Sequence, residues 1–432
     1  MNPRARRDSG VLLLASAAYI IIYYFIYTCY LHPVFDYARY NLIDRPWPFL
    51  ALTGVLALVP VLACGGLTRI SSFMAYLIYL LCYVPTILTL GLALPGGMEQ
   101  VLDLQCAFLA GMVLLFCMDR FPEGNAAAGR IRRLPLAHLT LLTALATLYV
   151  IQAYGFNLRF VALDEVYALR SENLEKVGGT LVGYLVMWLT SCLYPLHLAI
   201  GLMRRSLWRV LAACAGLVLI YMATGAKASL FTPVIVFLLF GFLKLPRPAL
   251  LPALALGLSA VSIALLLLPE DPLVLKWSRS LFFMRTLSVN GWSNKLYFEF
   301  FSTHGFTWYS HLSWARWLTA PYPYGPFQPG QVLGLEVSGS ELANFNANFW
   351  STEGIAAAGG LGVLVASGLM AVFLWFSNRV TEGLDLTFTI LVFAQFAITL
   401  LNIPFFTAMW SGAGLPLLAM LTLFEFGGEE GP

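Results

Sequence analysis

The sequence predicts an all-α, polytopic integral membrane protein with about 12 transmembrane helices. Hydrophobic residues make up 59% of its 432 residues and charged residues 11%, whereas charged residues make up about 25% of an average soluble domain. The mean hydropathy is +0.78. The apolar stretches are continuous and do not alternate as the strands of a membrane barrel do. A soluble domain and a disordered chain are both excluded, because neither keeps so much apolar surface in water.

Successive apolar runs along the chain justify the predicted helices one by one, since each run approaches the length of a membrane crossing. The first follows a basic segment, 1–10, without a small-residue cleavage site, so we expect an uncleaved helix there. The fourth, seventh and eighth runs are short and lie near the lower limit of spanning length. In chain order the predicted helices cover 10–31, 47–66, 73–94, 101–118, 134–153, 182–202, 207–223, 228–244, 249–268, 353–376, 385–403 and 405–423.

The distribution of Lys and Arg predicts the orientation, because short loops rich in these residues face the cytoplasm. With the N-terminus inside, the short cytoplasmic loops carry the basic excess. Most of the other basic residues fall in two long loops, at 154–181 and 269–352, to which the rule does not apply. We therefore expect a single membrane domain over 1–432, with both termini in the cytoplasm and both long loops outside. Loops of this length are commonly functional.

Two basic residues before the second long loop are candidate anion ligands. Arg170 lies mid-way along a helix predicted from Asp164 to Lys176. It either faces a cavity or pairs with acidic neighbours and lipid headgroups. Lys227 opens the eighth helix directly after the turn at 224–226, beside the free N–H groups of a helix N-terminus. It is either an anion ligand or a side chain that extends to the outer headgroups.

The second long loop is rich in cationic, aromatic and amide side chains. If one helix covers 276–285, Lys276 and Arg279 share a face, and Arg285 lies about 120° away. Arg and Lys bind phosphate or pyrophosphate, and Arg does so bidentately. Aromatic faces stack on sugar rings, while amides pair with hydroxyl groups. The candidate sugar ligands are Tyr297, Asn344, Asn346 and Asn348.

The sequence indicates neither a metal nor a cofactor. It contains no HExxH, GxSxG or phosphate-loop motif. The seven cysteines form no CxxC pair, and His304 and His311 lack an acidic partner at metal-ligand spacing. The net charge of +3 is too small to indicate a nucleic-acid partner.

An ordered set of short motifs runs through the second half of the chain. In order they are Thr224-Gly225-Ala226-Lys227, Arg279, Tyr297-Phe298-x-Phe300-Phe301, Tyr322-Pro323, Gly334, Asn346-Ala347-Asn348, Gly354 and Gly360-Leu361-Gly362. Together with the two long outer loops, this set resembles the O-antigen (Wzy-type) repeat-unit polymerases of Gram-negative bacteria. The similarity covers about 154–362 and rests on order, spacing and topology, because each motif is loose by itself.

The resemblance implies a GT-C-like glycosyltransferase of the bacterial inner membrane with a periplasmic active site. Its donor and acceptor would both be undecaprenyl-pyrophosphate-linked oligosaccharides, and a chain-length regulator would be a further partner. The growing glycan would leave its pyrophosphate and join a sugar hydroxyl of the incoming repeat unit, with inversion. The residues then expected to stabilise the leaving pyrophosphate are Arg170, Lys227, Arg279 and Arg285. The general base stays open among four candidates, which are His311, Glu299, Glu353 and Asp164.

Three other functions share parts of this pattern. An O-antigen ligase has the large periplasmic loop and the same donor, but its acceptor is lipid A–core. An exopolysaccharide or capsule polymerase has the same mechanism and a different product. A lipid-linked oligosaccharide flippase would place its basic residues along a central cavity. Here the predicted membrane interiors hold few charges, and a flippase has no use for the large outer loop.

Overall fold

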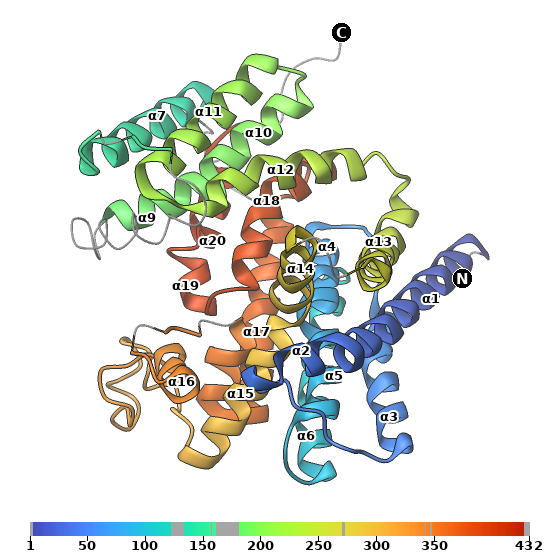
Figure 1. Cartoon of the computed structure of the whole chain (residues 1–432). Coiled ribbons are helices and arrows are strands. Elements are labelled where there is room, and N and C mark those ends of the chain that lie inside the picture. Colours follow the sequence, from blue (N-terminus) through green and yellow to red (C-terminus); the bar gives the residue numbers. More distant parts are fainter. Residues whose placement is uncertain are drawn as a thin grey trace. The chain divides into compact units, whose positions relative to one another are not determined.

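The computed structural model is built from helices (Figure 1). It describes residues 3–121, 134–156, 158–160, 181–269, 273–341, 343–345 and 348–426. Within these ranges, pairing of the β type is limited to one isolated bridge between Leu134 and Phe424. The helices are α1 (Pro3–Ile26), α2 (His32–Phe35), α3 (Trp47–Leu58), α4 (Ile70–Ile78), α5 (Val84–Ala93), α6 (Met98–Cys117), α7 (Leu136–Ala153), α9 (Leu181–Trp188), α10 (Tyr194–Met203), α11 (Leu207–Thr224), α12 (Lys227–Phe242), α13 (Arg247–Leu267), α14 (Leu273–Ser280), α15 (Val289–His304), α16 (Pro329–Ser338), α17 (Ala356–Val380), α18 (Leu386–Leu400), α19 (Phe405–Met409) and α20 (Gly414–Leu423).

Short π-helical segments interrupt several of the long helices. Three of them end two residues before a proline, at Pro33, Pro85 and Pro195. Proline has no N–H to donate to the preceding turn and its ring crowds that turn, so a widened turn relieves the clash. The π-helical segments are Tyr27–Leu31, Tyr79–Tyr83, Leu189–Leu193, Leu281–Ser288 and Trp350–Ile355.

The prediction of an all-helical membrane protein is confirmed. In the described part of the chain, nine helical segments are long and apolar enough to cross a membrane, and the apolar segments Trp47–Ala63, Lys227–Phe242 and Leu386–Leu400 are shorter. Together they overlap all the predicted runs. The number of crossings and their orientation stay predictions.

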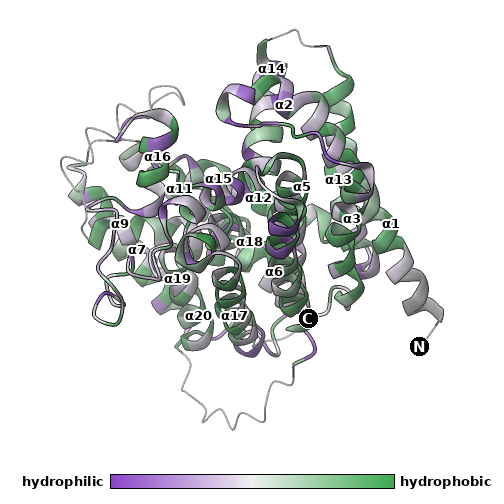
Figure 2. Ribbon diagram, turned by 90° about the horizontal axis from the view of Figure 1, so that it is seen from below, coloured by the Kyte–Doolittle hydropathy of each residue, from purple (hydrophilic) through white to green (hydrophobic). Residues whose placement is uncertain are grey.

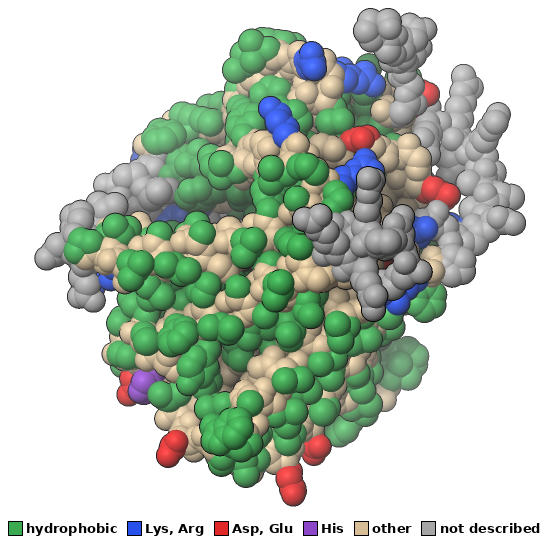
Figure 3. All heavy atoms as spheres, turned by 90° about the vertical axis from the view of Figure 1, so that its right-hand side faces the viewer, with side chains coloured by type: hydrophobic (Ala, Val, Ile, Leu, Met, Phe, Trp, Pro, Cys, Tyr) green, Lys and Arg blue, Asp and Glu red, His purple; other side chains and the backbone are tan. Residues whose placement is uncertain are grey.

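Apolar side chains dominate both the helices and their outer surface. Figure 2 shows hydrophobic residues along most of the long helices. Figure 3 shows a face on which hydrophobic side chains form a broad exposed area, with acidic and His side chains at its lower end. Leu14, Leu62 and Leu267 are all more than two-thirds exposed. A lipid environment accounts for such exposure, because an apolar surface of this extent is unfavourable in water.

The chain divides into two compact units. Unit 1 comprises 1–121, 245–375 and 401–405, and unit 2 comprises 122–244, 376–400 and 406–432. In unit 1, α1 packs along α13, and α15 packs against α5 and the π-helical segment Trp350–Ile355. In unit 2, α10 packs against α11 and α18, and α12 packs against the same two helices. The expectation of a single membrane domain stays a prediction.

The contact between α15 and α5 positions the asparagines of α15 discussed below. Pro85 in α5 leaves the carbonyl of Leu81 without its usual helical donor, and Asn290 Nδ2 of α15 donates to that oxygen at 2.8 Å. Gly291 permits the close approach, because a Cβ there would lie 2.4 Å from the Pro85 carbonyl oxygen. The proline therefore leaves a carbonyl acceptor at Leu81, to which Asn290 of the long segment 269–352 donates.

Candidate functional site

A network of amides, which we call the asparagine network, joins α15 to the segment before α17. Asn348 Nδ2 donates to Asn290 Oδ1 at 3.0 Å. Asn348 Oδ1 accepts the backbone N–H groups of Trp350 and Ser351 at 2.9 and 3.2 Å. Ser351 Oγ donates in turn to Asn294 Oδ1. Both ends of the Asn348 amide are engaged, so the predicted sugar contact of Asn348 would have to replace one of these bonds.

A buried cation directly follows Asn294 in α15. Lys295 is fully buried, and its Nζ lies 2.8 Å from Glu299 Oε1. The same Nζ donates to the carbonyl of Arg39 at 3.0 Å. Burial lowers the pKa of Lys295, and the nearby Glu299 carboxylate opposes that shift. Arg39 also approaches Glu336, at 3.7 Å, so these four groups link α15 and α16 to the segment after α2.

The segment after α15 has a constrained backbone. The N–H groups of Thr307 and Trp308 donate to the carbonyls of Ala356 and Ala357, both at 2.8 Å. Trp308 and Tyr309 have φ angles of +48° and +65°. Such angles cost on the order of 1–3 kcal/mol in a residue that carries a side chain, and they concentrate at functional sites. The two bonds to the start of α17 hold this conformation.

His311 follows this constrained turn and is buried. Its Nδ1 lies 2.8 Å from Thr307 Oγ1, while its Nε2 is buried without a hydrogen-bond partner. Burial lowers the pKa of His311 to about 4, so the imidazole is neutral near pH 7. In the tautomer whose Nδ1–H donates to Thr307, Nε2 carries a lone pair that can accept a proton.

Three hydroxyl oxygens in the same part of unit 1 are likewise buried without a hydrogen-bond partner. They are the hydroxyl groups of Tyr309, Tyr322 and Thr352. The Tyr309 ring stacks on the imidazole with 6.3 Å between centroids. Burial, and then the charge of Glu353, raises the pKa of Tyr309 to about 12. We call Tyr309, His311, Tyr322, Thr352 and Glu353 the His311 cluster. A buried polar atom without a partner costs about 1–3 kcal/mol, so this cluster is suited to a ligand rich in hydroxyl groups.

Tyr297 connects the cluster to α15. It is fully buried, and its hydroxyl donates to the Phe345 carbonyl at 3.2 Å. Burial raises its pKa, the adjacent Thr352 hydroxyl opposes the shift, and Glu353 and Tyr322 add to it. The side chain is surrounded by protein. Its contact with a sugar stays a prediction.

The geometry separates the described candidate bases. Glu299 is ion-paired with Lys295. Glu353 is buried, and its Oε2 accepts the N–H of Phe405 at 2.8 Å. Glu299 Oε1 has no hydrogen-bond partner but is ion-paired with Lys295, whereas the buried Nε2 of His311 has neither a hydrogen bond nor an ion pair. The fourth candidate, Asp164, lies outside the described residues.

The predicted pyrophosphate ligands occupy different environments. Arg279 is buried, and its guanidinium donates to the carbonyl of Leu268. Arg285 is exposed and close enough to Tyr40 to act on the pKa of that phenol, which burial raises. Lys227 begins α12 in unit 2. The remaining predicted ligands, Arg170 and the sugar candidate Asn346, lie outside the described residues, and Asn344 is exposed.

Several residues that the fold brings together could not be singled out as site residues from the sequence. The sequence does draw attention to Lys295, because it is a lone cation within an aromatic segment. Tyr309, Tyr322 and Thr352 give no such signal among the many aromatic and hydroxyl residues of the segment 269–352. Arg316 was also missed. It lies near Tyr322 and partly opposes the rise in the pKa of that phenol, which burial and Tyr324 produce.

The fold and these polar clusters define a polytopic helical membrane protein with a buried polar site in its longest connecting segment. Comparisons with protein-family models, curated proteins and solved structures found no match. Among the described residues, no group of three or more His, Cys, Asp or Glu side chains is arranged to hold a metal ion.

Proposed function

We propose that this protein is an inner-membrane polymerase of lipid-linked oligosaccharides. It transfers a growing glycan from undecaprenyl pyrophosphate to a sugar hydroxyl of the next undecaprenyl-pyrophosphate-linked repeat unit, on the periplasmic face, in O-antigen biosynthesis. The sequence resemblance supplies this substrate class. The buried, unpartnered Nε2 of His311 is the structural observation that carries the proposal, because a hydroxyl nucleophile needs a base within hydrogen-bonding distance.

The proposed step uses the His311 cluster as the acceptor side of the site. The acceptor hydroxyl gives its proton to His311 Nε2 as its oxygen bonds to the anomeric carbon of the donor. The bond from that carbon to the pyrophosphate oxygen breaks, and the electron pair leaves with the pyrophosphate. Attack opposite the leaving group inverts the anomeric centre. The hydroxyl groups of Tyr309, Tyr322 and Thr352 hold sugar hydroxyls, which supply the partners that these buried oxygens lack.

Cationic side chains favour departure of the pyrophosphate, because its negative charge grows in the transition state. Arg279, Arg285 and Lys227 are proposed for this role on the basis of the resemblance. Arg316 joins them because of its position near Tyr322. Arg170 belongs to the same set of predicted ligands. The energy comes from the glycosyl–pyrophosphate bond, so the step needs no nucleotide.

The test is to delete the gene in the bacterium that carries it and to resolve the surface glycolipids on a gel. We expect glycolipid with a single repeat unit and no ladder, restored by the intact gene. An unchanged ladder would contradict a role in O-antigen synthesis. Bare lipid A–core with long lipid-linked polymer would identify a ligase, and single lipid-linked repeats trapped in the cytoplasmic leaflet would identify a flippase.

A further inference from the structure

A separate cavity of unit 1, of about 380 Å³, opens beside the end of α3. Its walls come from α1, the segment after α3, the end of α6 and the first turns of α13. Leu12, Leu251 and Pro252 provide apolar surface, while Arg120 and Arg247 provide two cations. The orientation predicted from the sequence places this end of unit 1 at the cytoplasmic membrane surface. None of these residues belongs to the His311 cluster.

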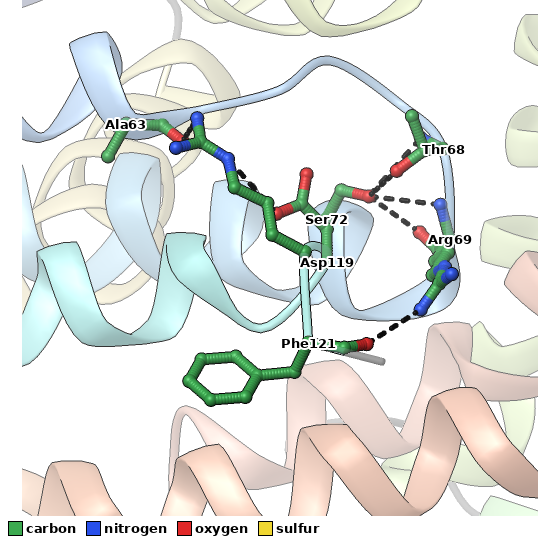
Figure 4. A network of polar contacts seen from close by, with 7 residues as sticks. Ala63, Thr68, Arg69, Ser72, Asp119 and Phe121 are labelled. Carbon is green, nitrogen blue, oxygen red and sulfur yellow. Dashed lines mark hydrogen bonds and ion pairs between the residues drawn. The ribbon is translucent and has the colours of Figure 1, made fainter. Parts of the chain in front are cut away.

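Arg120 is held across one wall of this cavity, which we call the Arg120 cavity. Its Nη2 donates to the carbonyl of Ala63 at 2.8 Å, and its Nε lies 3.9 Å from Asp119 Oδ1. Figure 4 shows Ala63 and Asp119, the two residues that Arg120 contacts. More than half of the side chain is nevertheless exposed, at 58%. The guanidinium is therefore oriented by the protein while one side of it stays open to a ligand.

The segment 64–68, which also lines the cavity, is held by the N-terminus of α4. Ser72 Oγ accepts the N–H groups of Thr68 and Arg69 at 3.2 and 3.0 Å, and it donates to the Arg69 carbonyl. Arg69 Nη1 donates to the Phe121 carbonyl at 3.3 Å (Figure 4). These bonds fix the segment 63–72 to the end of α6. A cavity with fixed walls binds a ligand at a lower entropic cost than one that must form on binding.

The charges beside the cavity leave it cationic. Asp119 is buried behind Gly65, where a Cβ would lie 2.5 Å from Asp119 Oδ2. Burial raises the pKa of Asp119, and Arg120 and Arg69 oppose that shift. The carboxylate is thus balanced by Arg69 as well as by Arg120. Arg247, at the start of α13, adds a second exposed cation beside a helix N-terminus, where anions are favoured.

We propose that the Arg120 cavity binds the phosphate headgroup of an anionic membrane lipid. The two arginines contact the phosphate, and the apolar residues below them contact the start of the acyl chains. A soluble phosphate would use the arginines and leave the apolar wall unused. Basic pockets between membrane helices on the cytoplasmic side commonly take such headgroups. The proposal is independent of the polymerase activity proposed above.

The experiment measures lipid binding to the purified full-length protein in neutral detergent. Phosphatidylglycerol and phosphatidylcholine of equal chain length are titrated, and adducts are counted by native mass spectrometry alongside the unfolding temperature. We expect phosphatidylglycerol to bind more tightly. Arg120→Gln and Arg247→Gln should each weaken its binding roughly fivefold, given about 1 kcal/mol per basic residue at a membrane surface. The matched control is Arg205→Gln, which removes an exposed cation from another loop predicted to be cytoplasmic and should leave binding unchanged.

Arg247→Gln guards against a folding artefact, because it changes an exposed side chain while the Arg120 bond to Ala63 remains. Equal binding of phosphatidylglycerol to wild type and to both variants would overturn the proposal. So would equal affinity for the two lipids. If inorganic phosphate alone stabilises the wild type as much as phosphatidylglycerol does, and both arginine variants lose this effect, the occupant is a soluble phosphate and the lipid assignment is overturned.

Discussion

The asparagine network and the His311 cluster are both buried, both polar and both part of unit 1, yet their hydrogen bonding differs. The amides of Asn348 and Asn290 use their donors and acceptors on other groups of the protein. In the His311 cluster, an imidazole nitrogen and three hydroxyl oxygens have no partner. A satisfied network stabilises the fold, whereas unsatisfied groups carry a cost that a ligand can remove. The comparison separates the residues that hold the site from those that we expect to act in it.

The largest expected effect is on activity, from His311→Ala. Loss of a general base lowers turnover by about 10²–10⁴-fold, and turnover is measured below the unfolding temperature of the variant because truncation of a buried imidazole also costs stability. The measurement is chain extension of a lipid-linked repeat unit by the purified protein. His304→Ala is the matched control, since His304 lies in the same segment and is exposed. Similar losses in both variants would remove the assignment of His311.

A large expected effect on stability comes from Gly291→Ala. The new Cβ would lie 2.4 Å from the Pro85 carbonyl oxygen and 2.7 Å from Thr89 Oγ1. The helices α15 and α5 must then separate, at a cost of about 3 kcal/mol. Gly257→Ala is the control, because a Cβ on that α13 glycine meets nothing within 4 Å. Thermal unfolding in detergent measures both, and equal midpoints would show that the α15–α5 contact is not tight.

A smaller loss of stability is expected from Asn290→Ala. It leaves the Leu81 carbonyl and Asn348 Nδ2 without partners, which costs about 2–3 kcal/mol. Asn344→Ala changes an exposed amide and should alter stability by less than about 0.5 kcal/mol. If Asn290→Ala instead abolished chain extension with an unchanged unfolding temperature, the asparagine network would belong to the reacting site and the comparison would fail.

The most gradual expected effect, spread over several pH units, is a dependence of stability on pH. The folded-state pKa of His311, about 4, lies below the ordinary value of 6.5. Between these values the unfolded chain binds more protons than the folded one, so stability falls as the pH drops from about 6.5 to about 4. The slope contributed by one such group is at most about 1.4 kcal/mol per pH unit. His311→Gln should flatten this slope in thermal unfolding measured across that range, and an unchanged slope would show that His311 titrates normally.

The helical membrane class and the positions of the apolar helices could be predicted because they depend on local hydropathy, which a run such as 249–268 shows by itself. The long segment 269–352 was likewise visible as a place rich in cations, aromatics and amides. The roles of the individual residues in this segment could not be predicted as well. The contact of Asn348 with a sugar stays a prediction, and its hydrogen bond to Asn290 of α15, 58 positions away, could not be predicted.

The sequence by itself determined that the helices need an apolar, lipid environment, and in which order the apolar helices follow one another. It also determined which segment is rich in polar groups. Each of these properties depends on residues that are neighbours along the chain. Only the tertiary structure decided which of those groups are satisfied. Asn290 reaches a carbonyl 209 positions away, and Lys295 reaches one 256 positions away. His311 Nε2 remains unpartnered. Such pairings depend on which distant segments pack together. Neither the composition nor the spacing of residues along the chain indicates which segments these are.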